Sequence, residues 1–352
     1  MKLRLLLLPF SFVYSLVAKV RNRFYDRGIF KVSKFPLPII VVGNLSVGGT
    51  GKTPHVEYLI RLLHRKFKVA TLSRGYGRRT TGFVVAGKGT TANLIGDEPM
   101  QYFSGFDDIT VSVCEDRVHG IERLLKLPVP PQVVIMDDGF QHRAIDPGLK
   151  IILTPADQPF THDYLLPAGN LREGREGYRR ADILIVSKCD PQMSEAAKLK
   201  LRNEINPLSH QQLFFSSVTY GELMPVSDGI SNLCKNPSQS NVILLTGIAN
   251  PAPIVNYLTP RVSELHLMQF PDHHIFSDKD MNALQKKFNS FAPGTGMIVT
   301  TEKDLQRLKQ NELKEWLDLL PFSCLPITVS IDNEPEFNKL IESYVAKNKG
   351  NS

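Results

Sequence analysis

The hydrophobic positions beyond residue 37 fall into short, almost unbroken runs separated by amphipathic stretches. Nearly continuous apolar runs are typical of strands that are covered on both faces of a sheet. They predict strands at 38–44, 68–73, 108–113, 132–138, 150–155 and 182–188. The i, i+3, i+4, i+7 spacing of a helix appears at Val56, Leu59, Ile60 and Leu63, and residues 117–127 predict a second helix. Strands that alternate with helices predict an α/β fold with a doubly wound, mostly parallel sheet.

The sequence changes character at 207–240, where polar and turn-forming residues surround one β-like run at 213–220. We interpret this stretch as an interdomain connection, with a linker over 211–240. The β/α pattern then resumes, with strands at 241–250, 264–270, 296–304 and 325–331 and helices near 278–290 and 334–347. The sequence therefore predicts a larger domain over 31–210 and a second, smaller α/β domain over 241–350, joined by a β linker.

The N-terminus is different, because an apolar run from Leu5 to Ala18 is flanked by lysine and arginine on both sides. A signal peptide needs small residues before its cleavage site, and Leu16 is a poor occupant of that position. A membrane-spanning helix needs about 20 apolar residues, whereas this run is only about 21 Å long at ~1.5 Å per residue. We therefore expect residues 1–30 to form a helix in the membrane interface, with an ordinary core helix as the alternative. Pro9 is expected to kink or restart this helix.

The composition of the 352-residue chain, with 42% hydrophobic and 22% charged residues, is that of a folded protein rather than a disordered one. The formal net charge of +7 favours an anionic partner, which can be nucleic acid, an acidic membrane or a phosphorylated substrate. The four cysteines form no CxxC pair. We therefore expect reduced thiols and a cytoplasmic location rather than a disulfide framework.

The stretch "VVGNLSVGGTGKTP" joins a predicted strand to a predicted helix through a glycine-rich loop. This is the arrangement of a phosphate-binding P-loop, in which glycines let backbone N–H groups surround phosphate oxygens. Lys52 is expected to reach the β- and γ-phosphates of a nucleotide, and the Thr53 hydroxyl to bind Mg²⁺. Serine replaces the first glycine of the usual pattern, so this position is expected to need no positive φ. The predicted nucleotide-binding residues are Ser46, Val47, Gly48, Gly49, Thr50, Gly51, Lys52 and Thr53.

A second nucleotide signal is "QVVIMDDGFQHR", in which an apolar strand ends at Asp137 and Asp138. A carboxylate at the C-terminal end of a parallel strand points into the ligand crevice and can hold Mg²⁺. A solvated Asp-Asp-Gly turn is the alternative, but the P-loop favours the metal-binding interpretation. The sequence therefore predicts a nucleoside triphosphate with Mg²⁺ on a P-loop-containing sheet.

Seven short motifs occur in one order along the chain: "GNLSVGGTGKTP", "SRGYGR" (73–78), "GDEP" (96–99), "DDGFQHR" (137–143), "LPAGNLRE" (166–173), "FPDHH" (270–274) and "TEKD" (301–304). Together they resemble the tetraacyldisaccharide 4'-kinase family of lipid A biosynthesis, from the N-terminus to about residue 310. The serine of the phosphate loop is part of the family's pattern. No role for Glu302 and Lys303 of the last motif follows from the sequence.

The resemblance implies transfer of the γ-phosphate of ATP to the 4'-hydroxyl of a tetraacyldisaccharide 1-phosphate, with ATP and Mg²⁺ as cofactors. It implies a P-loop kinase domain and a smaller α/β domain, with nucleotide and acceptor between them. Because the acyl chains of this lipid A precursor stay in the bilayer, it also implies a peripheral enzyme. The N-terminal helix would hold that enzyme at the anionic cytoplasmic face of the inner membrane. We expect a monomer and no nucleic-acid partner.

The resemblance also implies roles for individual residues. Asp97 is implied as the base that takes the proton of the sugar hydroxyl, with His273 beside it, while Lys52 stabilises charge on the transferring phosphoryl group. Taken alone, Asp97 also suits the N-cap of a helix, and His274 competes with its neighbour for the histidine role. Contacts with the acceptor are implied for Arg74, Arg78, Asn170, Arg172, Glu98, Gln141 and His142.

Two other classes of protein remain as alternatives. The stretch "VSKCD" (186–190) ends a predicted strand and is similar to the motif with which GTPases bind guanine, although Ser187 replaces the usual Asn or Thr. A P-loop GTPase or metal-insertion switch would prefer GTP and need no lipid acceptor, so nucleotide preference discriminates between the two. A nucleic-acid-binding ATPase is disfavoured because the basic residues are scattered and no recognition motif appears.

Overall fold

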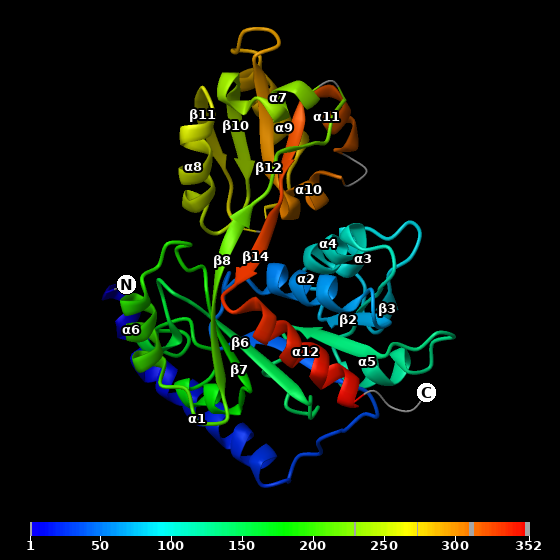
Figure 1. Cartoon of the computed structure of the whole chain (residues 1–352), viewed down its shortest axis with the longest axis vertical. Coiled ribbons are helices and arrows are strands. Elements are labelled where there is room, and N and C mark those ends of the chain that lie inside the picture. The colour runs from blue at the N-terminus through cyan, green and yellow to red at the C-terminus, as the bar shows by residue number, and fades with distance from the viewer. Residues whose placement is uncertain (1, 229, 273, 310–312, 349–352) are drawn as a thin grey trace. The chain divides into compact units, whose positions relative to one another are not determined.

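The computed structural model describes residues 2–228, 230–272, 274–309 and 313–348 (Figure 1). The chain forms two compact units, and neither is one continuous stretch of sequence. The larger unit consists of Met1–Lys88, Tyr102–Val218 and Val329–Ser352, and the smaller unit consists of Gly89–Gln101 and Thr219–Thr328. One boundary between the units falls inside helix α4 (Asp97–Gly105).

The larger unit is built on a nine-stranded sheet with the order β14-β8-β7-β6-β1-β5-β2-β4-β3. The strands are β1 (Ile39–Asn44), β2 (Val69–Ser73), β3 (Val84–Val85), β4 (Thr110–Val113), β5 (Val133–Asp137), β6 (Leu149–Pro155), β7 (Ile183–Ser187), β8 (Gln212–Tyr220) and β14 (Ile327–Ile331). Every pair from β8 through to β4 is parallel, whereas β3 runs antiparallel to β4. The predicted strands and the mostly parallel α/β sheet are confirmed.

The centre of this sheet places two of the sequence motifs at one edge. Strands β1 and β5 are buried at every position, which explains their unbroken apolar runs. They pair in parallel with Val42 opposite Asp137, so the chain leaves both strands at the same end. Helix α2 (Lys52–Leu63) follows β1 and packs on β1 and β5. Its buried apolar face consists of the predicted residues Val56, Leu59, Ile60 and Leu63.

The remaining helices of the larger unit include one at each end of the chain. A 3-10 helix at Lys2–Leu7 precedes α1 (Leu8–Asp26), which has Pro9 in its first turn. The predicted restart at proline is confirmed, because proline lacks an N–H and is tolerated in the first turn of a helix. Nowhere in the described ranges is a helix both long and apolar enough to cross a membrane. Other α-helices of this unit are α5 (Arg117–Leu124) and α6 (Glu195–Ile205), and short 3-10 helices lie at Phe160–His162 and Arg175–Arg180.

The C-terminal helix α12 (Glu334–Asn348) also belongs to the larger unit. The prediction that it belongs to the smaller domain over 241–350 is wrong. Its buried face is formed by Phe337, Ile341 and Val345. The Tyr344 hydroxyl donates a hydrogen bond to the Ile39 carbonyl oxygen at 3.0 Å. An amphipathic pattern shows that a helix has a buried face, but it does not show which sheet that face covers.

The smaller unit has a five-stranded sheet in the order β11-β10-β12-β13-β9. Its strands are β9 (Met224–Pro225), β10 (Asn241–Thr246), β11 (Glu264–Gln269), β12 (Gly296–Thr301) and β13 (Phe322–Leu325). Its helices are α3 (Ala92–Ile95), α7 (Ser231–Lys235), α8 (Ala252–Leu258), α9 (Asp278–Phe288), α10 (Glu302–Leu308) and α11 (Lys314–Leu319). All strand pairs are parallel except β13 with β9.

Three predicted segments of this half of the chain differ from the structure. The run at 296–304 is strand β12 followed by helix α10, because the Thr301 side chain accepts a hydrogen bond from the Asp304 backbone N–H and caps the helix. The run at 325–331 is divided between β13 and β14, which lie in different sheets. The β-like part of the predicted linker is β8, a full strand of the larger sheet that continues to Tyr220.

Candidate active site

The phosphate loop of the larger unit has the conformation that its glycines permit. Gly48 has φ 105° and Gly51 has φ 88°, in the region that side chains disfavour. Helix α2 begins directly after Gly51, so the loop ends at the N–H groups of a helix N-terminus. Ser46 is not among the described non-glycine residues with positive φ, as predicted, and forms a β-bridge with Leu171.

Two side chains and one backbone contact hold the loop in shape. The Asn44 amide donates to Thr50 Oγ1 at 3.0 Å, and the Ser187 hydroxyl donates to the Thr50 carbonyl oxygen at 2.7 Å. The Val47 N–H donates to the Asn170 carbonyl oxygen at 2.7 Å. The loop that carries "LPAGNLRE" is therefore fastened directly to the P-loop.

Lys52 and Asp138 form the charged centre of this region. Lys52 Nζ lies 3.5 Å from Asp138 Oδ1 and 3.4 Å from Asn44 Oδ1. Arg172 donates to the other carboxylate oxygen of Asp138 at 2.8 Å. Burial by itself raises the pKa of Asp138, but Lys52 and Arg172 outweigh it and hold this pKa below its usual range. Asp138 is therefore ionised at neutral pH.

Asp137 is buried at the end of β5, and Tyr102 donates a hydrogen bond to its Oδ2 at 2.9 Å. Thr53, Asp137 and Asp138 supply oxygen donors, the kind of ligand that Mg²⁺ takes. The described residues contain no group of three or more His, Cys, Asp or Glu side chains that could form an all-protein metal cage. The donors present fit a Mg²⁺ that also uses water and phosphate oxygens, as is usual at nucleotide sites.

Cationic side chains gather around His142. Its pKa is lowered to about 4 by burial and by the charges of Arg117, Arg74 and Arg21. Burial also lowers the pKa of Arg117 to about 10, while Asp137 and Asp138 raise it. A neutral imidazole among guanidinium groups leaves net positive charge, which suits a phosphate group.

The other residues predicted at the acceptor are engaged by neighbours in the larger unit. The Gln141 amide donates to the Asn44 carbonyl oxygen at 2.9 Å and to Glu173 Oε1 at 3.0 Å. Asn170 Oδ1 accepts from Arg4 at 3.1 Å. Arg78 is paired with Glu115, which lies between β4 and α5, so its contact with an acceptor stays a prediction.

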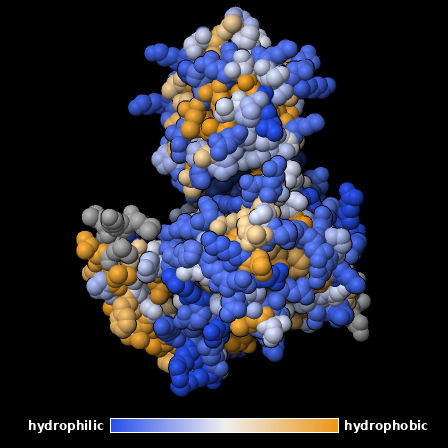
Figure 2. Space-filling model, turned by 60° about the vertical axis from the view of Figure 1, so that its left-hand side comes forward, coloured by the Kyte–Doolittle hydropathy of each residue, from blue (hydrophilic) through white to orange (hydrophobic). Residues whose placement is uncertain are grey.

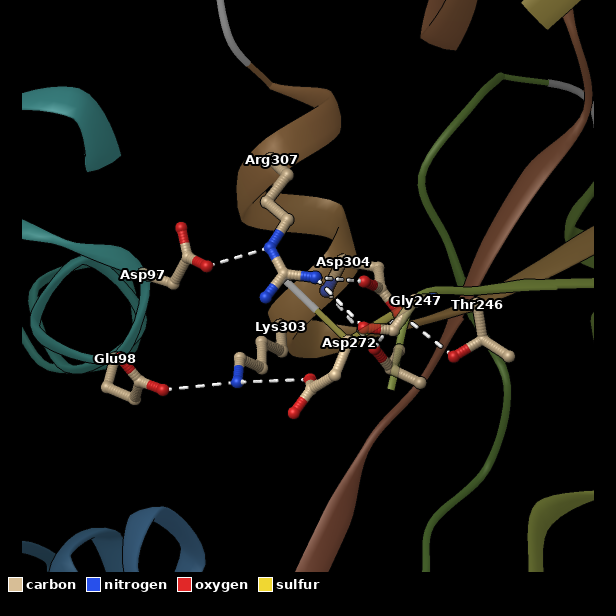
Figure 3. Close-up of polar contacts among 9 residues, drawn as sticks. Asp97, Glu98, Thr246, Gly247, Asp272, Lys303, Asp304 and Arg307 are labelled. Atoms are coloured by element: carbon tan, nitrogen blue, oxygen red, sulfur yellow. Dashed lines mark hydrogen bonds and ion pairs between the residues drawn. The ribbon is translucent and has the colours of Figure 1, made fainter. Parts of the chain in front are cut away.

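Asp97 and Glu98 lie in the smaller unit, in the first turn of α4 (Figure 3). Asp97 Oδ2 accepts from Arg307 Nε at 2.7 Å, and Glu98 pairs with Lys303 at 3.1 Å. His273 lies outside the described residues, so its predicted role beside Asp97 is untested. Its neighbour His274 pairs with Asp280 at 3.1 Å.

Five residues of these regions are not singled out by the sequence analysis: Tyr102, Arg117, Glu173, Lys188 and Arg307. Glu173 is the last residue of the "LPAGNLRE" motif. Lys188 lies in "VSKCD", the stretch that is similar to a GTPase motif. Its Nζ lies beside Gly49 of the P-loop, 4.0 Å from the position that a Cβ would take there. Arg307 follows "TEKD" by three residues, one helical turn. Tyr102 and Arg117 have no local signal, because tertiary packing brings them to Asp137 and Asp138.

Comparisons with known proteins agree with this arrangement. The family model for LpxK, tetraacyldisaccharide-1-P 4'-kinase, matches residues 3–346. Tetraacyldisaccharide 4'-kinase of Flavobacterium johnsoniae is 42% identical over 98% of both chains. The protein of the same name from Bacteroides fragilis is 44% identical over 98% of this chain and 94% of its own.

A solved structure is also similar to the chain. The crystal structure of LpxK from Aquifex aeolicus in complex with ATP has a TM-score of 0.75 and 32% identity, covering 97% of this chain and 99% of that one. Both kinds of comparison cover almost the whole length, and they select the kinase over the GTPase and nucleic-acid alternatives. The chain therefore belongs to the tetraacyldisaccharide-1-phosphate 4'-kinase family.

Proposed function

We propose that the protein transfers the γ-phosphate of ATP to the 4'-hydroxyl of a tetraacyldisaccharide 1-phosphate, with Asp97 as the base. The 4'-oxygen forms a bond to the γ-phosphorus as the bond from that phosphorus to the bridging oxygen of ADP breaks. The hydroxyl proton passes to the Asp97 carboxylate. His273 assists by hydrogen bonding, and Glu98 contributes to acceptor binding.

The nucleotide is held by the P-loop N–H groups from Ser46 to Thr53 and by Lys52. When Mg²⁺ is bound, it neutralises charge on the β- and γ-phosphate oxygens, and Thr53, Asp137 and Asp138 are the residues that would hold it. The observation that carries the proposal is the shared position of Asp138. Its two carboxylate oxygens contact Lys52 of the P-loop at 3.5 Å and Arg172 of the "LPAGNLRE" loop at 2.8 Å, so the expected nucleotide and acceptor loops meet at one side chain.

Helix α1 supports a position at the membrane surface. Its inward-facing side chains include Ser11 and Asn22, whereas most of its large apolar side chains are exposed. Ser11 is 5% exposed, whereas Phe12 is 72% exposed, and the exposed apolar side chains form a hydrophobic band (Figure 2). Such a face suits the interface of an anionic bilayer, which is where the acyl chains of the acceptor lie. We propose that the enzyme works at the cytoplasmic face of the inner membrane, and the exposed apolar face of α1 supports a membrane-bound position.

The same helix contacts the loops that carry the expected acceptor residues. The Ser11 hydroxyl donates to the Leu165 carbonyl oxygen at 2.9 Å, and the Tyr14 hydroxyl donates to the Arg172 carbonyl oxygen at 2.8 Å. Arg21 donates to the Gln141 carbonyl oxygen.

The role of Asp97 is tested by steady-state kinetics of Asp97→Asn. The substitution keeps the shape of the side chain but removes its capacity to take a proton. We expect kcat to fall by about 10²-fold to 10⁴-fold, the range for loss of a general base, with the KM for ATP little changed. The matched control is Asp107→Asn, at an exposed aspartate outside the described contacts, which should keep wild-type kcat. An Asp97→Asn enzyme with wild-type kcat would remove Asp97 as the base.

A further inference from the structure

We propose that Arg307 is a positioning residue for Asp97, and that the buried carboxylate of Asp304 fixes Arg307 in turn. This proposal rests on the proposed function, because it needs Asp97 to act as the base. All the residues involved belong to the smaller unit. It gives the "TEKD" segment a role, which the sequence leaves open.

Asp304 is the fixed point of the arrangement. It is 0% exposed, and a buried carboxylate is tolerated only when hydrogen bonds and opposite charge replace its water. Its Oδ2 accepts from Thr246 Oγ1 at 3.0 Å, from the Gly247 N–H at 3.1 Å and from Thr301 Oγ1 at 2.8 Å. Three donors from two segments therefore fix the carboxylate, and its Oδ1 accepts from Arg307 at 2.8 Å.

Arg307 transmits this fixed geometry to Asp97 (Figure 3). Its side chain is 4% exposed, and its NH1 group donates to Asp304 Oδ1 and to the Gly247 carbonyl oxygen at 3.2 Å. Because the guanidinium group is planar and rigid, fixing NH1 also fixes the direction of the Nε–H. That N–H donates to Asp97 Oδ2 at 2.7 Å. The orientation of the Asp97 carboxylate is thus set by a chain of contacts that begins at Asp304.

Lys303 provides a second and looser support for the same turn of α4. Its Nζ lies 3.1 Å from Glu98 Oε1 and 3.9 Å from Asp272 Oδ1. Its side chain is 24% exposed, compared with 4% for Arg307, and a half-buried lysine without a planar group of donors fixes direction less strictly. We therefore assign the directional role to Arg307 rather than to Lys303.

The consequence is kinetic, because a base acts only within hydrogen-bond reach of the proton that it takes. A misplacement of about 1 Å can lower a rate by ~10²-fold without affecting the binding of a distant substrate group. Arg307→Gln removes the charge and the fork of donors. We expect kcat to fall by ~10²-fold with the KM for ATP unchanged. Arg307→Lys keeps the charge without the planar fork, so it should restore part of the lost kcat.

The decisive experiment measures Arg307→Gln both in the wild-type chain and in the Asp97→Asn chain. If Arg307 acts through Asp97, its substitution lowers kcat much less in the Asp97→Asn chain, because the oriented base is already lost. Equal fold-changes in both chains would overturn the proposal. If Asp97→Asn alone has no effect, the proposed function fails instead, so the two failures are distinguishable.

Arg307 is buried, so a purely structural loss must be separated from misplacement of the base. Circular dichroism and thermal unfolding of each variant report folding. If Arg307→Gln fails to fold, Arg307→Lys becomes the test variant, with the same comparison in the Asp97→Asn chain. The matched control is Arg261→Gln, an exposed arginine of the same unit that stacks on Tyr257 and should keep wild-type kcat. A folded Arg307→Lys enzyme with wild-type kcat, together with an unfolded Arg307→Gln chain, would overturn the proposal.

Discussion

His55 lies in the first turn of α2 and holds the end of the phosphate loop. Its Nδ1 lies 2.7 Å from the Gly51 carbonyl oxygen, which can only accept, so Nδ1 carries the hydrogen. Its Nε2 therefore accepts from the Ser216 hydroxyl at 2.9 Å. Burial lowers the pKa of His55 from 6.5 to about 4, although the bond to Gly51 opposes the shift. The ring is neutral at neutral pH, and the bond that Nε2 accepts from Ser216 needs this form.

This pKa predicts a pH dependence of stability. As pH falls below 6.5, the unfolded chain protonates His55, whereas the folded chain keeps it neutral down to about pH 4. The unfolded state then binds more protons, so the free energy of unfolding decreases between these two pH values and is unaffected by this group at higher pH. The shift corresponds to about 3 kcal/mol. Urea unfolding over this pH range should show a flatter profile for His55→Gln than for wild type.

The exposed histidine His210 supplies the control for that experiment. His210→Gln should keep the wild-type profile, because the His210 side chain is exposed and lies outside the buried core. His142, whose pKa is also lowered to about 4, leaves a residual slope in the His55→Gln chain. Identical profiles for wild type and His55→Gln would show that the ring is not buried in its neutral form.

The roles of single residues could be predicted where the residues belong to a motif with a known chemical function. Lys52 and Asp138 follow from the P-loop and from an acidic strand end, and the structure places them 3.5 Å apart. Arg117 and Arg307 have no such signal. Both side chains are buried, and the site carboxylates near them are distant in sequence: Asp137 and Asp138 for Arg117, and Asp97 for Arg307. A residue type alone does not identify a distant partner.

Helix α1 shows how one element serves two surfaces. Its polar face contacts loops of the expected acceptor site, and its apolar face is exposed. Deletion of the helix would remove both the contacts with the acceptor loops and the exposed apolar face. Point substitutions are therefore needed to test the two faces separately. We predict that Ser11→Ala combined with Tyr14→Phe keeps vesicle binding but raises the KM for the acceptor. Each hydrogen bond contributes about 0.5–1.5 kcal/mol, so the KM should rise by roughly tenfold while the KM for ATP stays the same.

The opposite face gives the matched variant. Phe12→Ser combined with Val17→Ser exposes polar atoms where apolar side chains would enter the bilayer, so sedimentation with anionic vesicles should fall by tenfold or more. When detergent micelles present the acceptor directly, the kcat of this double variant should remain near that of the wild type. Undiminished vesicle binding by this variant would mean that α1 is not the membrane-facing element.

At the scale of elements, the apolar periodicity located seven strands of the larger sheet, β1, β2 and β4 to β8, to within about two residues, the usual precision of boundaries. It missed β3, which is only Val84–Val85, and it merged β14 with β13. The apolar periodicity predicted the end of an element poorly where one capping side chain determines that end. Strand β12 stops at Thr301 because that residue caps α10, and the apolar run alone continues past it. The start of α1 at Pro9 could be predicted, because the ring of proline restricts this residue to the first turn of a helix.

At the scale of the whole molecule, the chain passes between its two units at 88–89, 101–102, 218–219 and 328–329. The predicted boundaries treat each domain as one stretch, because periodicity is local and does not report which sheet a distant segment joins. Residues 89–101 were predicted in the larger domain but belong to the smaller unit, whereas helix α12 was predicted in the smaller domain but belongs to the larger unit. The assignment of residues 89–101 matters for function, because Asp97 then lies in the unit that does not contain the P-loop.

The activity expected of this chain is the phosphorylation of the 4'-hydroxyl of a lipid A precursor with ATP. The direct measurement incubates the full chain with ATP and Mg²⁺ and a tetraacyldisaccharide 1-phosphate in mixed micelles, and locates the new phosphate by ³¹P NMR. We predict a phosphate on the 4'-oxygen, its absence with Lys52→Ala, and a lower rate with GTP. Hydrolysis of the nucleotide without transfer, or transfer to another hydroxyl group, would contradict the account.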